Sequence, residues 1–387
     1  MKLVLLPSPP FEEIGGVSTH VYMLAKGIRE LGHEVSVIPE NPPTWIRVPF
    51  IRIPEVIFGW VSLYLSRRYR RWAEDAYYFV ETLWKTKGQI DVLNIQNVQH
   101  VGMAKWLSSL TGCRLVLTVH GYLTYEAESR NWCSMGDQTH QWLWSMEKAG
   151  YDQVDSLVCV GRKAASYVAQ FTKKPITIIP NGLDTEVYKP GSKEAPQKTR
   201  ILFAGLLQAP KGILDALQAI HILDQQSKMK VSLSVAGMGP QEVAAKQYVR
   251  DNGLKDQVTF LGSLRKEKMP EFYRQGDILL FPSRQAGLSG KSEESSPYSV
   301  LEAMSSGLPV ISYRTSALEE HVQDGITGYL VEAGDVNGLA NRIRKLADDT
   351  ELLRIMGSAA RNHCVKCFSH IRMAQQYVRV YESKLKG

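Results

Sequence analysis

The sequence predicts an α/β protein built from two doubly wound domains, each a parallel sheet with helices on both faces. Short apolar runs rich in Val, Ile and Leu alternate with segments of helical periodicity, and this alternation resets once near residue 200. The 387 residues, of which 44% are apolar, are enough to form two sizeable cores. A polar stretch at 184–199, with Pro and Gly and no apolar period, separates the two series.

In the first half of the chain, apolar runs predict the strands of one sheet. Strands are expected at 2–6, 34–38, 91–95, 114–119, 155–160 and 176–179, and helices at 17–31, 101–110 and 162–171. Continuous apolar runs are typical of parallel strands that are buried on both faces. We assign residues 1–183 to an N-terminal Rossmann-like domain.

The second half repeats the pattern. Strands are expected at 200–204, 230–236, 257–261, 277–281, 309–312 and 328–331, and helices at 211–224, 241–251, 266–274, 298–306 and 336–347. We assign 184–199 to a linker and 200–368 to a C-terminal Rossmann-like domain, and we expect a helix at about 369–387 to pack back on the first domain. Ligands of open α/β sheets bind beyond the carboxyl ends of the strands, so the active site is expected in a cleft between the domains.

Charge and cysteine content argue against several classes of function. Lys and Arg exceed Asp and Glu by 46 to 39, a mild excess that disfavours nucleic-acid binding and suits anionic small molecules or lipids. No apolar run is long enough to span a membrane, and the one before Pro7 is too short for a signal peptide. The odd number of cysteines, with Cys113 and Cys159 in or beside apolar runs, indicates a reducing, cytoplasmic compartment. Cys364 and Cys367 lack a second pair of ligands, so we interpret their spacing as incidental.

Two strand-to-helix turns have the composition of anion sites. Gly15 and Gly16 let a ligand approach the backbone closely, and the following helix offers free N–H groups, although an ordinary tight turn would have the same residues. The second turn is better specified. There Ser295 and Ser296 provide a cap, and Pro297 at the first helical position opens an apolar helix whose N-terminus would face a diphosphate.

Four side chains near predicted strand ends are candidates for the site. Glu302, just over a turn into that helix, and Glu294, just before it, could accept hydrogen bonds from hydroxyls, or both could be solvated surface acids. Lys211 begins a helix whose dipole disfavours a cation, which bound phosphate would explain, although an ordinary exposed lysine is the alternative. His120 ends the strand 114–119, where side chains project towards ligands, but a structural histidine is equally compatible.

Several short motifs occur in the order found in one known family, and together they cover nearly the whole chain. They are Gly15-Gly16-Val17 with His20-Val21 and Gly32-His33-Glu34-Val35; Ile179-Pro180-Asn181-Gly182-Leu183-Asp184; Phe203-Ala204-Gly205 with Lys211-Gly212; Gly237-Met238-Gly239-Pro240; and Glu294 through Glu302 followed by Ala303-Met304 and Gly307-Leu308-Pro309-Val310-Ile311. On these residues the chain resembles the retaining glycosyltransferases of family 4, which have the GT-B fold of two facing Rossmann-like domains.

The resemblance implies a role for each side-chain candidate. Glu302 would bind the ribose hydroxyls of a nucleotide sugar, and Glu294 would contact the hexose hydroxyls. Lys211 would neutralise the diphosphate, and His120 would touch the transferred sugar near the reaction centre. In such enzymes the departing diphosphate is thought to help deprotonate the incoming hydroxyl on the same face, so no dedicated nucleophile is expected.

The resemblance also implies how the backbone holds the donor. The remaining donor-binding positions would be Gly15, Gly16, Gly205, Pro297, Tyr298, Ser299 and Val300. The nucleotide sugar is a substrate, no other cofactor is implied, and the sequence contains no Asp-x-Asp metal motif. The acceptor, a glycan or a lipid-linked molecule, would bind the N-terminal domain.

The chain departs from the family pattern at three places. Leu206 stands where an arginine is usual, and Arg284, Lys291 or Arg314 are the alternatives for the missing charge. The stretch 283–292 is longer than expected, so Glu293 competes with Glu294 for the hexose contact. Met238 replaces a common Asp.

Residues 45–72 combine apolar and aromatic side chains with a cluster of arginines, Arg67, Arg68, Arg70 and Arg71. This composition suits contact with an anionic leaflet, and a buried helix pair with a solvated basic end is the alternative.

The sequence therefore predicts a metal-independent, retaining glycosyltransferase that moves a hexose or N-acetylhexosamine from a nucleotide diphosphate sugar, with UDP as the favoured carrier. The acceptor is expected at the cytoplasmic face of a membrane. Two alternatives stay open: a catalytically degenerate protein that binds a membrane or a partner, and a nucleotide-sugar epimerase on the same fold.

Overall fold

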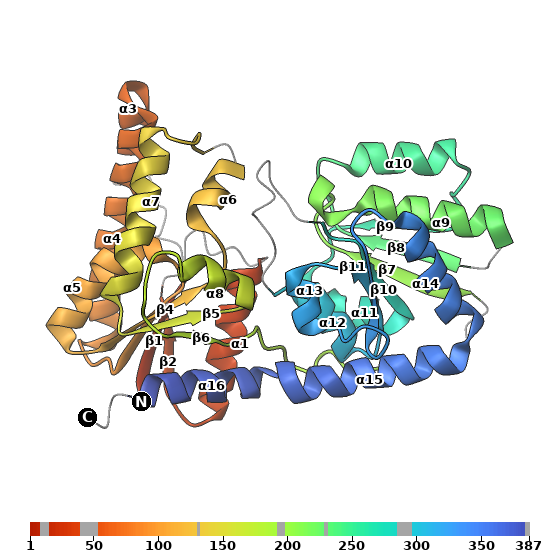
Figure 1. The fold of residues 1–387 in the computed structure, drawn as a ribbon. Helices are drawn as coiled ribbons and strands as arrows, with labels where there is room; N and C mark the ends of the chain where they lie inside the picture. Colours follow the sequence, from red (N-terminus) through yellow and green to blue (C-terminus); the bar gives the residue numbers. More distant parts are fainter. Residues whose placement is uncertain are drawn as a thin grey trace. The chain divides into compact units, whose positions relative to one another are not determined.

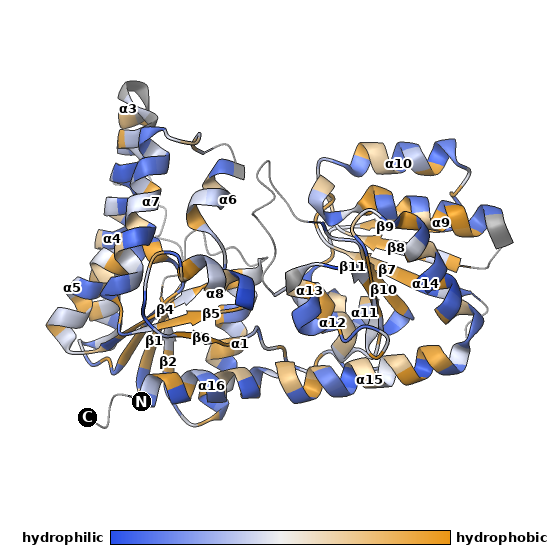
Figure 2. Ribbon diagram, viewed as in Figure 1, coloured by the Kyte–Doolittle hydropathy of each residue, from blue (hydrophilic) through white to orange (hydrophobic). Residues whose placement is uncertain are grey.

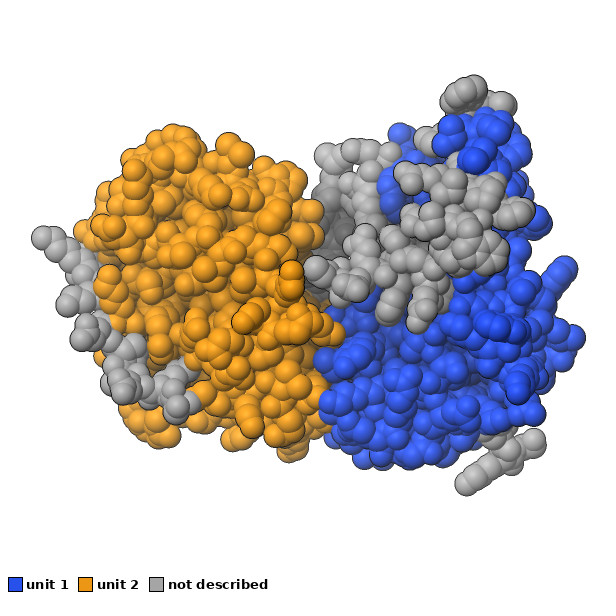
Figure 3. All heavy atoms as spheres, turned by 180° about the vertical axis from the view of Figure 1, so that it is seen from behind, with its two compact units in different colours: residues 1–182, 370–387 blue, residues 183–369 orange. Residues whose placement is uncertain are grey.

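A computed structural model describes residues 1–7, 15–38, 53–129, 132–191, 198–227, 231–284 and 296–383. The chain forms two compact units (Figure 1, Figure 3). Unit 1 comprises Met1–Gly182 and His370–Gly387, and unit 2 comprises Leu183–Ser369. Each unit contains one six-stranded parallel sheet, so the predicted fold class of two doubly wound α/β domains is confirmed.

The sheet of unit 1 consists of β1 (Lys2–Leu6), β2 (Glu34–Val37), β3 (Val92–Ile95), β4 (Arg114–Val119), β5 (Ser156–Cys159) and β6 (Ile176–Ile178). Its strand order is β2-β1-β3-β4-β5-β6, so the direction of winding reverses between β1 and β3. Ligands of doubly wound sheets bind at such a reversal, outside the carboxyl ends of the strands.

The helices of unit 1 are α1 (Gly16–Glu30), α3 (Ile53–Val61), α4 (Leu63–Thr86), α5 (Val101–Thr111), α6 (Leu123–Ser129), α7 (Gln138–Gly150), α8 (Arg162–Val168) and α16 (His370–Glu382). α4, α5 and α8 contribute to a buried cluster on one face of the sheet. α1 and α16 pack against each other, and α16 reaches the opposite face, where Tyr381 bonds Asn94 on β3. The close packing needs Gly27 on α1, because a Cβ there would lie 2.7 Å from the His370 carbonyl oxygen.

The sheet of unit 2 consists of β7 (Thr199–Ala204), β8 (Val231–Ala236), β9 (Val258–Gly262), β10 (Ile278–Phe281), β11 (Val310–Tyr313) and β12 (Gly328–Val331). Its order is β12-β11-β10-β7-β8-β9, with the reversal between β7 and β10. Figure 2 shows how strongly apolar these strands are, as expected for a sheet covered on both faces.

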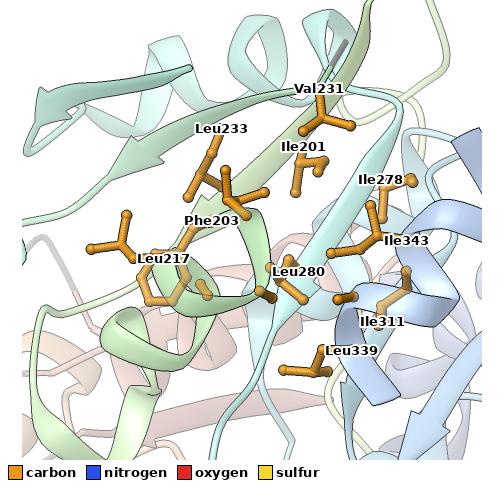
Figure 4. Close-up of a cluster of buried hydrophobic side chains, with 14 of the residues drawn as sticks. Ile201, Phe203, Leu217, Val231, Leu233, Ile278, Leu280, Ile311, Leu339 and Ile343 are labelled. Carbon is orange, nitrogen blue, oxygen red and sulfur yellow. The ribbon is translucent and has the colours of Figure 1, made fainter. Parts of the chain in front are cut away.

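The helices of unit 2 are α9 (Ile213–Ser227), α10 (Glu242–Asp251), α11 (Met269–Gln275), α12 (Tyr298–Ser305), α13 (Ser316–His321), α14 (Val336–Asp348) and α15 (Thr350–Phe368). α9, α10 and α14 cover one face and close a core in which Phe203, Leu280 and Leu339 are fully buried (Figure 4). Burying a side chain of this size contributes roughly 1.5–3 kcal/mol. α12 packs on α15.

The segment that begins at Leu183 is packed within unit 2. Leu183 pairs with Ser369 in an isolated parallel bridge, and Asp184 and Tyr188 are buried. Arg361 on α15 donates to the carbonyl oxygens of Tyr188 and Ser305, each over 2.9 Å. The beginning of the polar stretch that composition assigns to a linker is thus part of unit 2. Residues 192–197 lie outside the described residues.

Candidate active site

At the strand reversal of unit 2, the segments after β7 and β10 lie backbone against backbone. The Arg284 N–H donates to the Pro210 carbonyl over 2.8 Å. Gly212 has a φ of +73°, and a Cβ there would lie 2.1 Å from the Pro282 carbonyl oxygen. A Cβ at Gly237, after β8, would lie 1.8 Å from the carbonyl oxygen of Gly205. Only glycine fits these two positions, so the carboxyl edge of the sheet is lined closely by backbone.

Lys211 lies at this crowded edge. It is the last residue of a one-turn helix, η4 (Ala209–Lys211), and α9 begins only at Ile213, so the prediction of a helix from residue 211 is wrong by two residues. The left-handed conformation of Gly212 separates the two turns. The Lys211 side chain is half-buried beside Pro210, whose carbonyl oxygen accepts from the segment after β10.

α12 begins beyond the other side of the reversal, after β10. Pro297 is its N-cap and makes no side-chain hydrogen bond to the helix, and the first turn carries no acidic residue. The expected serine cap with Pro297 at the first helical position is therefore wrong. Instead, the Ser296 hydroxyl lies 2.9 Å from Nε2 of His321 on α13. The first turn consists of Tyr298, Ser299 and Val300, and a helix N-terminus with its positive dipole end favours an anion.

Glu302 lies one turn further along α12, with a half-buried side chain. Burial raises the pKa of its carboxyl group, and interactions with Tyr188, Tyr273 and Lys266 partly offset that rise. The Tyr273 hydroxyl is buried and makes no hydrogen bond of normal geometry within the described part of the chain. A carboxylate that is partly desolvated in this way gains from a ligand that donates hydroxyl hydrogen bonds.

Residues 285–295, which precede Ser296 and Pro297, lie outside the described residues. They include Glu294, its competitor Glu293, and Lys291. The hexose contact assigned to Glu294 therefore stays a prediction. Of the other candidates for the missing arginine, Arg284 lies beside Pro210 and pairs with Asp215, Nε to Oδ2, over 2.8 Å.

Arg314, the third candidate, follows β11 and is held by three carboxylates. Its guanidinium lies 2.8 Å from Asp324, 3.3 Å from Glu319 and 3.4 Å from Glu332. Leu206, which occupies the position of the expected arginine, has 56% of its surface exposed, and Met238 on the next loop has 51%. The two replacements thus give the loops after β7 and β8 apolar tips.

In unit 1, α1 begins with two glycines. Gly15 is the N-cap, which makes no side-chain hydrogen bond to the helix, and Gly16 is the first helical residue. A Cβ at Gly16 would meet no atom within 4 Å among the described residues. The first turn of α1 carries no acidic residue, which keeps its N-terminus suited to an anion.

His120 follows β4 and is half-buried. Its Nε2 lies 2.8 Å from Oε1 of Gln96, which follows the neighbouring strand β3. His20, one turn into α1, contacts the His120 ring edge to face, with ring centroids 4.6 Å apart. His20 Nδ1 in turn lies 2.8 Å from Asn181 Oδ1. The start of α1, the end of β4 and the motif around Asn181 therefore meet at one place in unit 1.

Sequence reasoning missed several residues at these places. Tyr188, Tyr273 and Lys266 interact with Glu302, but Tyr188 lies in one segment and Lys266 and Tyr273 in another, both distant in sequence from Glu302, and no local pattern marks them. Gln96 could have been found, because it follows β3 as His120 follows β4, and the carboxyl ends of adjacent parallel strands lie together. Asn181 was part of a recognised motif without a role.

No group of three or more His, Cys, Asp or Glu side chains among the described residues is arranged to hold a metal ion. No helix in the same ranges is both long and apolar enough to cross a bilayer.

Two family models match the chain, one after the other. Residues 14–187 match the model described as Glycosyltransferase Family 4, and residues 184–363 match the model described as Glycosyl transferases group 1. The chain is a family 4-like, group 1 glycosyltransferase. It is an enzyme of the hexosyltransferase type, and the resemblance found in its motifs is confirmed.

Curated relatives cover almost the full length of this glycosyltransferase. It is 26% identical to the MMP alpha-(1->4)-mannosyltransferase of Mycolicibacterium hassiacum, over 100% of this chain and 98% of that protein. It is 25% identical to N-acetyl-alpha-D-glucosaminyl L-malate synthase of Bacillus anthracis, over 97% and 96%. It is 26% identical to phosphatidyl-myo-inositol mannosyltransferase of Mycobacterium leprae, over 99% and 97%.

Solved structures share the fold. Anabaena Alr3699/HepE in complex with UDP-glucose is similar with a TM-score of 0.70 at 17% identity, over 98% of this chain and 99% of that one. Sucrose-phosphate synthase from Thermosynechococcus elongatus is similar with a TM-score of 0.73 at 20% identity, over 100% of both chains. The glycosyltransferase therefore has the GT-B fold class of two Rossmann-like sheets.

Proposed function

We propose that this glycosyltransferase transfers a hexose or N-acetylhexosamine, with retention and without a metal, from a UDP-sugar to a glycan or lipid-linked acceptor. The observation that carries the proposal is the start of α12. A helix N-terminus suited to phosphate is followed one turn later by a half-buried carboxyl group suited to a diol. A nucleoside diphosphate carries both groups, because its ribose has a diol and its diphosphate is an anion.

The donor would be held mainly by unit 2. Glu302 would accept from the ribose hydroxyls, and the N–H groups of Tyr298, Ser299 and Val300 would bind phosphate oxygens. Lys211 would neutralise the diphosphate from the loop after β7. Arg284 is our candidate for the second cation, because its backbone bonds Pro210 directly before Lys211.

Unit 1 would contribute to the transferred sugar and the acceptor. His120 would contact the sugar, and the turn at Gly15 and Gly16 would approach the leaving diphosphate. Cation, helix N-termini and backbone dipoles would then all stabilise the negative charge that develops on the leaving group. The departing phosphate would take the proton of the incoming hydroxyl on the same face, which accounts for retention without a protein nucleophile.

UDP is proposed as the carrier because a structural neighbour, Anabaena Alr3699/HepE, was solved with UDP and with UDP-glucose. A lipid-linked acceptor is proposed because one full-length relative is named as a phosphatidyl-myo-inositol mannosyltransferase. Both statements are carried over from those proteins to this one as part of the proposal.

A membrane surface on α3 and α4 would bring the enzyme to such an acceptor. Among the described residues of these antiparallel helices, Val56 and Ile57 on α3 and Trp72 and Trp84 on α4 are exposed, Trp72 by 66% and Trp84 by 78%. Exposed aromatic and aliphatic side chains of this kind insert at the interface of a bilayer. Residues 45–52 of the predicted membrane segment lie outside the described residues.

The arginines of α4 contribute less charge than the sequence suggests. Arg70 pairs with Glu74 over 2.9 Å and with Glu55 over 3.4 Å, and Arg71 pairs with Asp75 over 3.6 Å. Arg67 adds little, because its Nη1 is buried, so anionic lipid would be attracted mainly by the exposed Arg68. We expect the protein to sediment with phosphatidylglycerol vesicles more than with phosphatidylcholine vesicles, and Trp72→Ser with Trp84→Ser to reduce that binding.

Val243→Ser is the matched control for vesicle binding. Val243 lies on α10 of unit 2 and is 78% exposed, so it removes an equally exposed apolar side chain from elsewhere. Equal binding by the two variants, at the wild-type level, would remove the membrane surface from the proposal.

Donor binding is tested by thermal unfolding with UDP-, GDP- and ADP-sugars, with slow donor hydrolysis followed in the same samples. A ligand that binds only the folded protein adds about 2.7 kcal/mol to the free energy of unfolding at a hundredfold excess over its Kd. The melting temperature rises accordingly. One UDP-sugar should stabilise and be hydrolysed, and Glu302→Ala should abolish the shift. If no nucleotide sugar stabilises the protein, the enzyme is degenerate at its donor site and the proposal fails.

A further inference from the structure

A chain of buried polar side chains in unit 1 leads to His120. Asn94 on β3 and Thr118 on β4 are fully buried in an otherwise apolar sheet. The Thr118 hydroxyl and Nε2 of Gln96 both donate to Asn94 Oδ1, each over 3.0 Å. Buried polar groups cost free energy unless they are paired, and fully paired chains hold their members rigidly. The half-buried His120 is the member that faces outwards.

The orientation of the Asn94 and Gln96 amide groups in the structure assigns the proton of His120 to one nitrogen. Asn94 donates Nδ2 to the Tyr381 hydroxyl over 2.7 Å, so its oxygen is turned to Gln96. Gln96 therefore donates its NH₂ group to Asn94, and its Oε1 faces His120 Nε2, 2.8 Å away. An amide oxygen can only accept, so Nε2 is the N–H and Nδ1 holds the lone pair.

We propose that Gln96 is a positioning residue that holds His120 in the Nε2–H tautomer, so that Nδ1 accepts a hydrogen bond from one hydroxyl of the transferred hexose. The inference rests on the proposed function, since the sugar supplies that hydroxyl. A donor without the hydroxyl leaves Nδ1 unpaired in a desolvated site, so it is discriminated against. Gln96 thereby helps to set sugar specificity without touching the sugar.

The titratable groups around His120 favour a neutral ring. His20 from α1 contacts it directly, and Tyr377 from α16 lies 3.4 Å from His20 Nε2. Burial, and after it the neighbouring His20, hold the pKa of His120 well below its usual value. Neutrality matters because an imidazolium has no lone pair with which to accept.

The test uses the full-length protein labelled with ¹⁵N-histidine, in which His120→Asn assigns the signal. We expect the wild type to show the Nε2–H tautomer. Gln96→Met, of similar length but without an acceptor, should release it into a mixture. Gln96→Glu keeps an acceptor but adds a negative charge, so it should favour the imidazolium and move the acid limb of activity to higher pH. Gln99→Glu, the same substitution three residues away, is the control.

The second readout is a cycle between Gln96→Met and UDP-hexoses that lack single hydroxyls. In the wild type, one deoxy donor should lose about tenfold or more in kcat/KM, and Gln96→Met should lose a smaller factor on the full donor, because part of its His120 keeps the productive tautomer. The two losses should not add, because they remove the same hydrogen bond.

Three results would overturn the proposal: an Nδ1–H tautomer in the wild type, a tautomer unaffected by Gln96→Met, or losses that add. Failure of all donors to bind would instead refute the proposed function, and the histidine spectra would still decide whether Gln96 sets the tautomer.

Discussion

Some residues proposed to bind ligand in this glycosyltransferase lower the stability of the ligand-free protein, and Glu302 is the clearest case. Its carboxyl group is partly desolvated by α12 and faces Tyr188, Tyr273 and Lys266, which offset only part of the cost of burial. The raised pKa means that the folded protein holds the proton of Glu302 at a pH where the unfolded chain has lost it. An ionised Glu302 therefore destabilises the ligand-free protein at neutral pH.

Glu302→Gln should raise the melting temperature of the ligand-free protein at pH 7 while it removes the shift caused by the donor. The amide keeps the shape of the side chain and carries no charge that burial would penalise. Differential scanning calorimetry with and without donor measures both effects. Glu267→Gln serves as the control, because Glu267 follows Lys266 in sequence and is exposed. A lower melting temperature for Glu302→Gln would contradict the argument.

His321 makes stability depend on pH in the opposite sense. Burial, as the largest cause, lowers its pKa to about 4, below the usual 6.5. Between these values the unfolded chain binds a proton that the folded protein does not, so stability falls as the pH drops from 6.5 towards 4, by about 3 kcal/mol for this one group. Urea unfolding across that range should show a shallower fall for His321→Gln.

Ser296→Ala separates the titration of His321 from its hydrogen bond. It removes the hydroxyl that lies 2.9 Å from Nε2 but leaves the buried imidazole, so its pH dependence should stay close to that of the wild type. If His321→Gln kept the wild-type slope, His321 would not lose its proton on folding.

At the scale of elements, α1 and α16 depend on each other. They come from distant parts of the sequence and meet at Gly27, where a Cβ would lie 2.7 Å from the His370 carbonyl and 2.8 Å from the Ala374 Cβ. Backbone packs against backbone at this point, and neither atom lies at the flexible end of a long side chain. The contact therefore leaves no room for even a methyl group.

Gly27→Ala should destabilise the protein by about 1–3 kcal/mol, because α16 must move away from α1. The matched control is Gly102→Ala on α5, where a Cβ would meet nothing within 4 Å among the described residues. That substitution should stabilise the protein by about 0.5–1 kcal/mol, the usual gain for alanine over glycine in a helix. Chemical denaturation of both variants measures the difference, and equal effects would refute the role of Gly27.

Most strands could be predicted from the sequence, because a doubly wound sheet leaves an apolar run wherever a strand is buried on both faces. β4 and β12 occur at the predicted residues, 114–119 and 328–331. The helices α4, α7 and α15 were given no predicted bounds, since polar and charged residues interrupt their apolar period. Strand order could not be predicted either, because it depends on contacts between runs that are similar in sequence.

The candidate site divides in the same way. Gly16, Lys211, Glu302 and His120 lie in local motifs, so the sequence could propose them, and their roles stay predictions, whereas Tyr188 and Lys266 reach Glu302 only through tertiary folding. The serine cap of α12 was predicted wrongly because His321, distant in sequence, lies within hydrogen-bond distance of the Ser296 hydroxyl.

At the scale of the whole molecule, the two units differ in how their chain is assembled. Unit 2 is one continuous segment, Leu183–Ser369, with its own core. Unit 1 is discontinuous, because α16 is joined to it only through unit 2. Without α16, the buried Asn94 and Thr118 would lose the hydroxyls of Tyr381 and Tyr377 as partners.

Residues 183–369 alone should fold and melt cooperatively, whereas residues 1–182 alone should not. The first fragment keeps every element of its sheet and the helices on both faces, and the second exposes one face of its sheet to water. Circular dichroism melts of the two fragments test this. A cooperative transition in 1–182 would show that α16 is dispensable for unit 1.

The placement of α16 also has a consequence for synthesis on the ribosome. Domains usually fold in the order in which they emerge, the N-terminal one first. Here the sheet of unit 1 is translated first, but the helix that covers one of its faces is translated after all of unit 2. The sheet face that α16 covers therefore stays exposed in the nascent first unit, where chaperones can bind it, while the second unit is made and folds. The half of the enzyme that begins to form first is the half that is completed last.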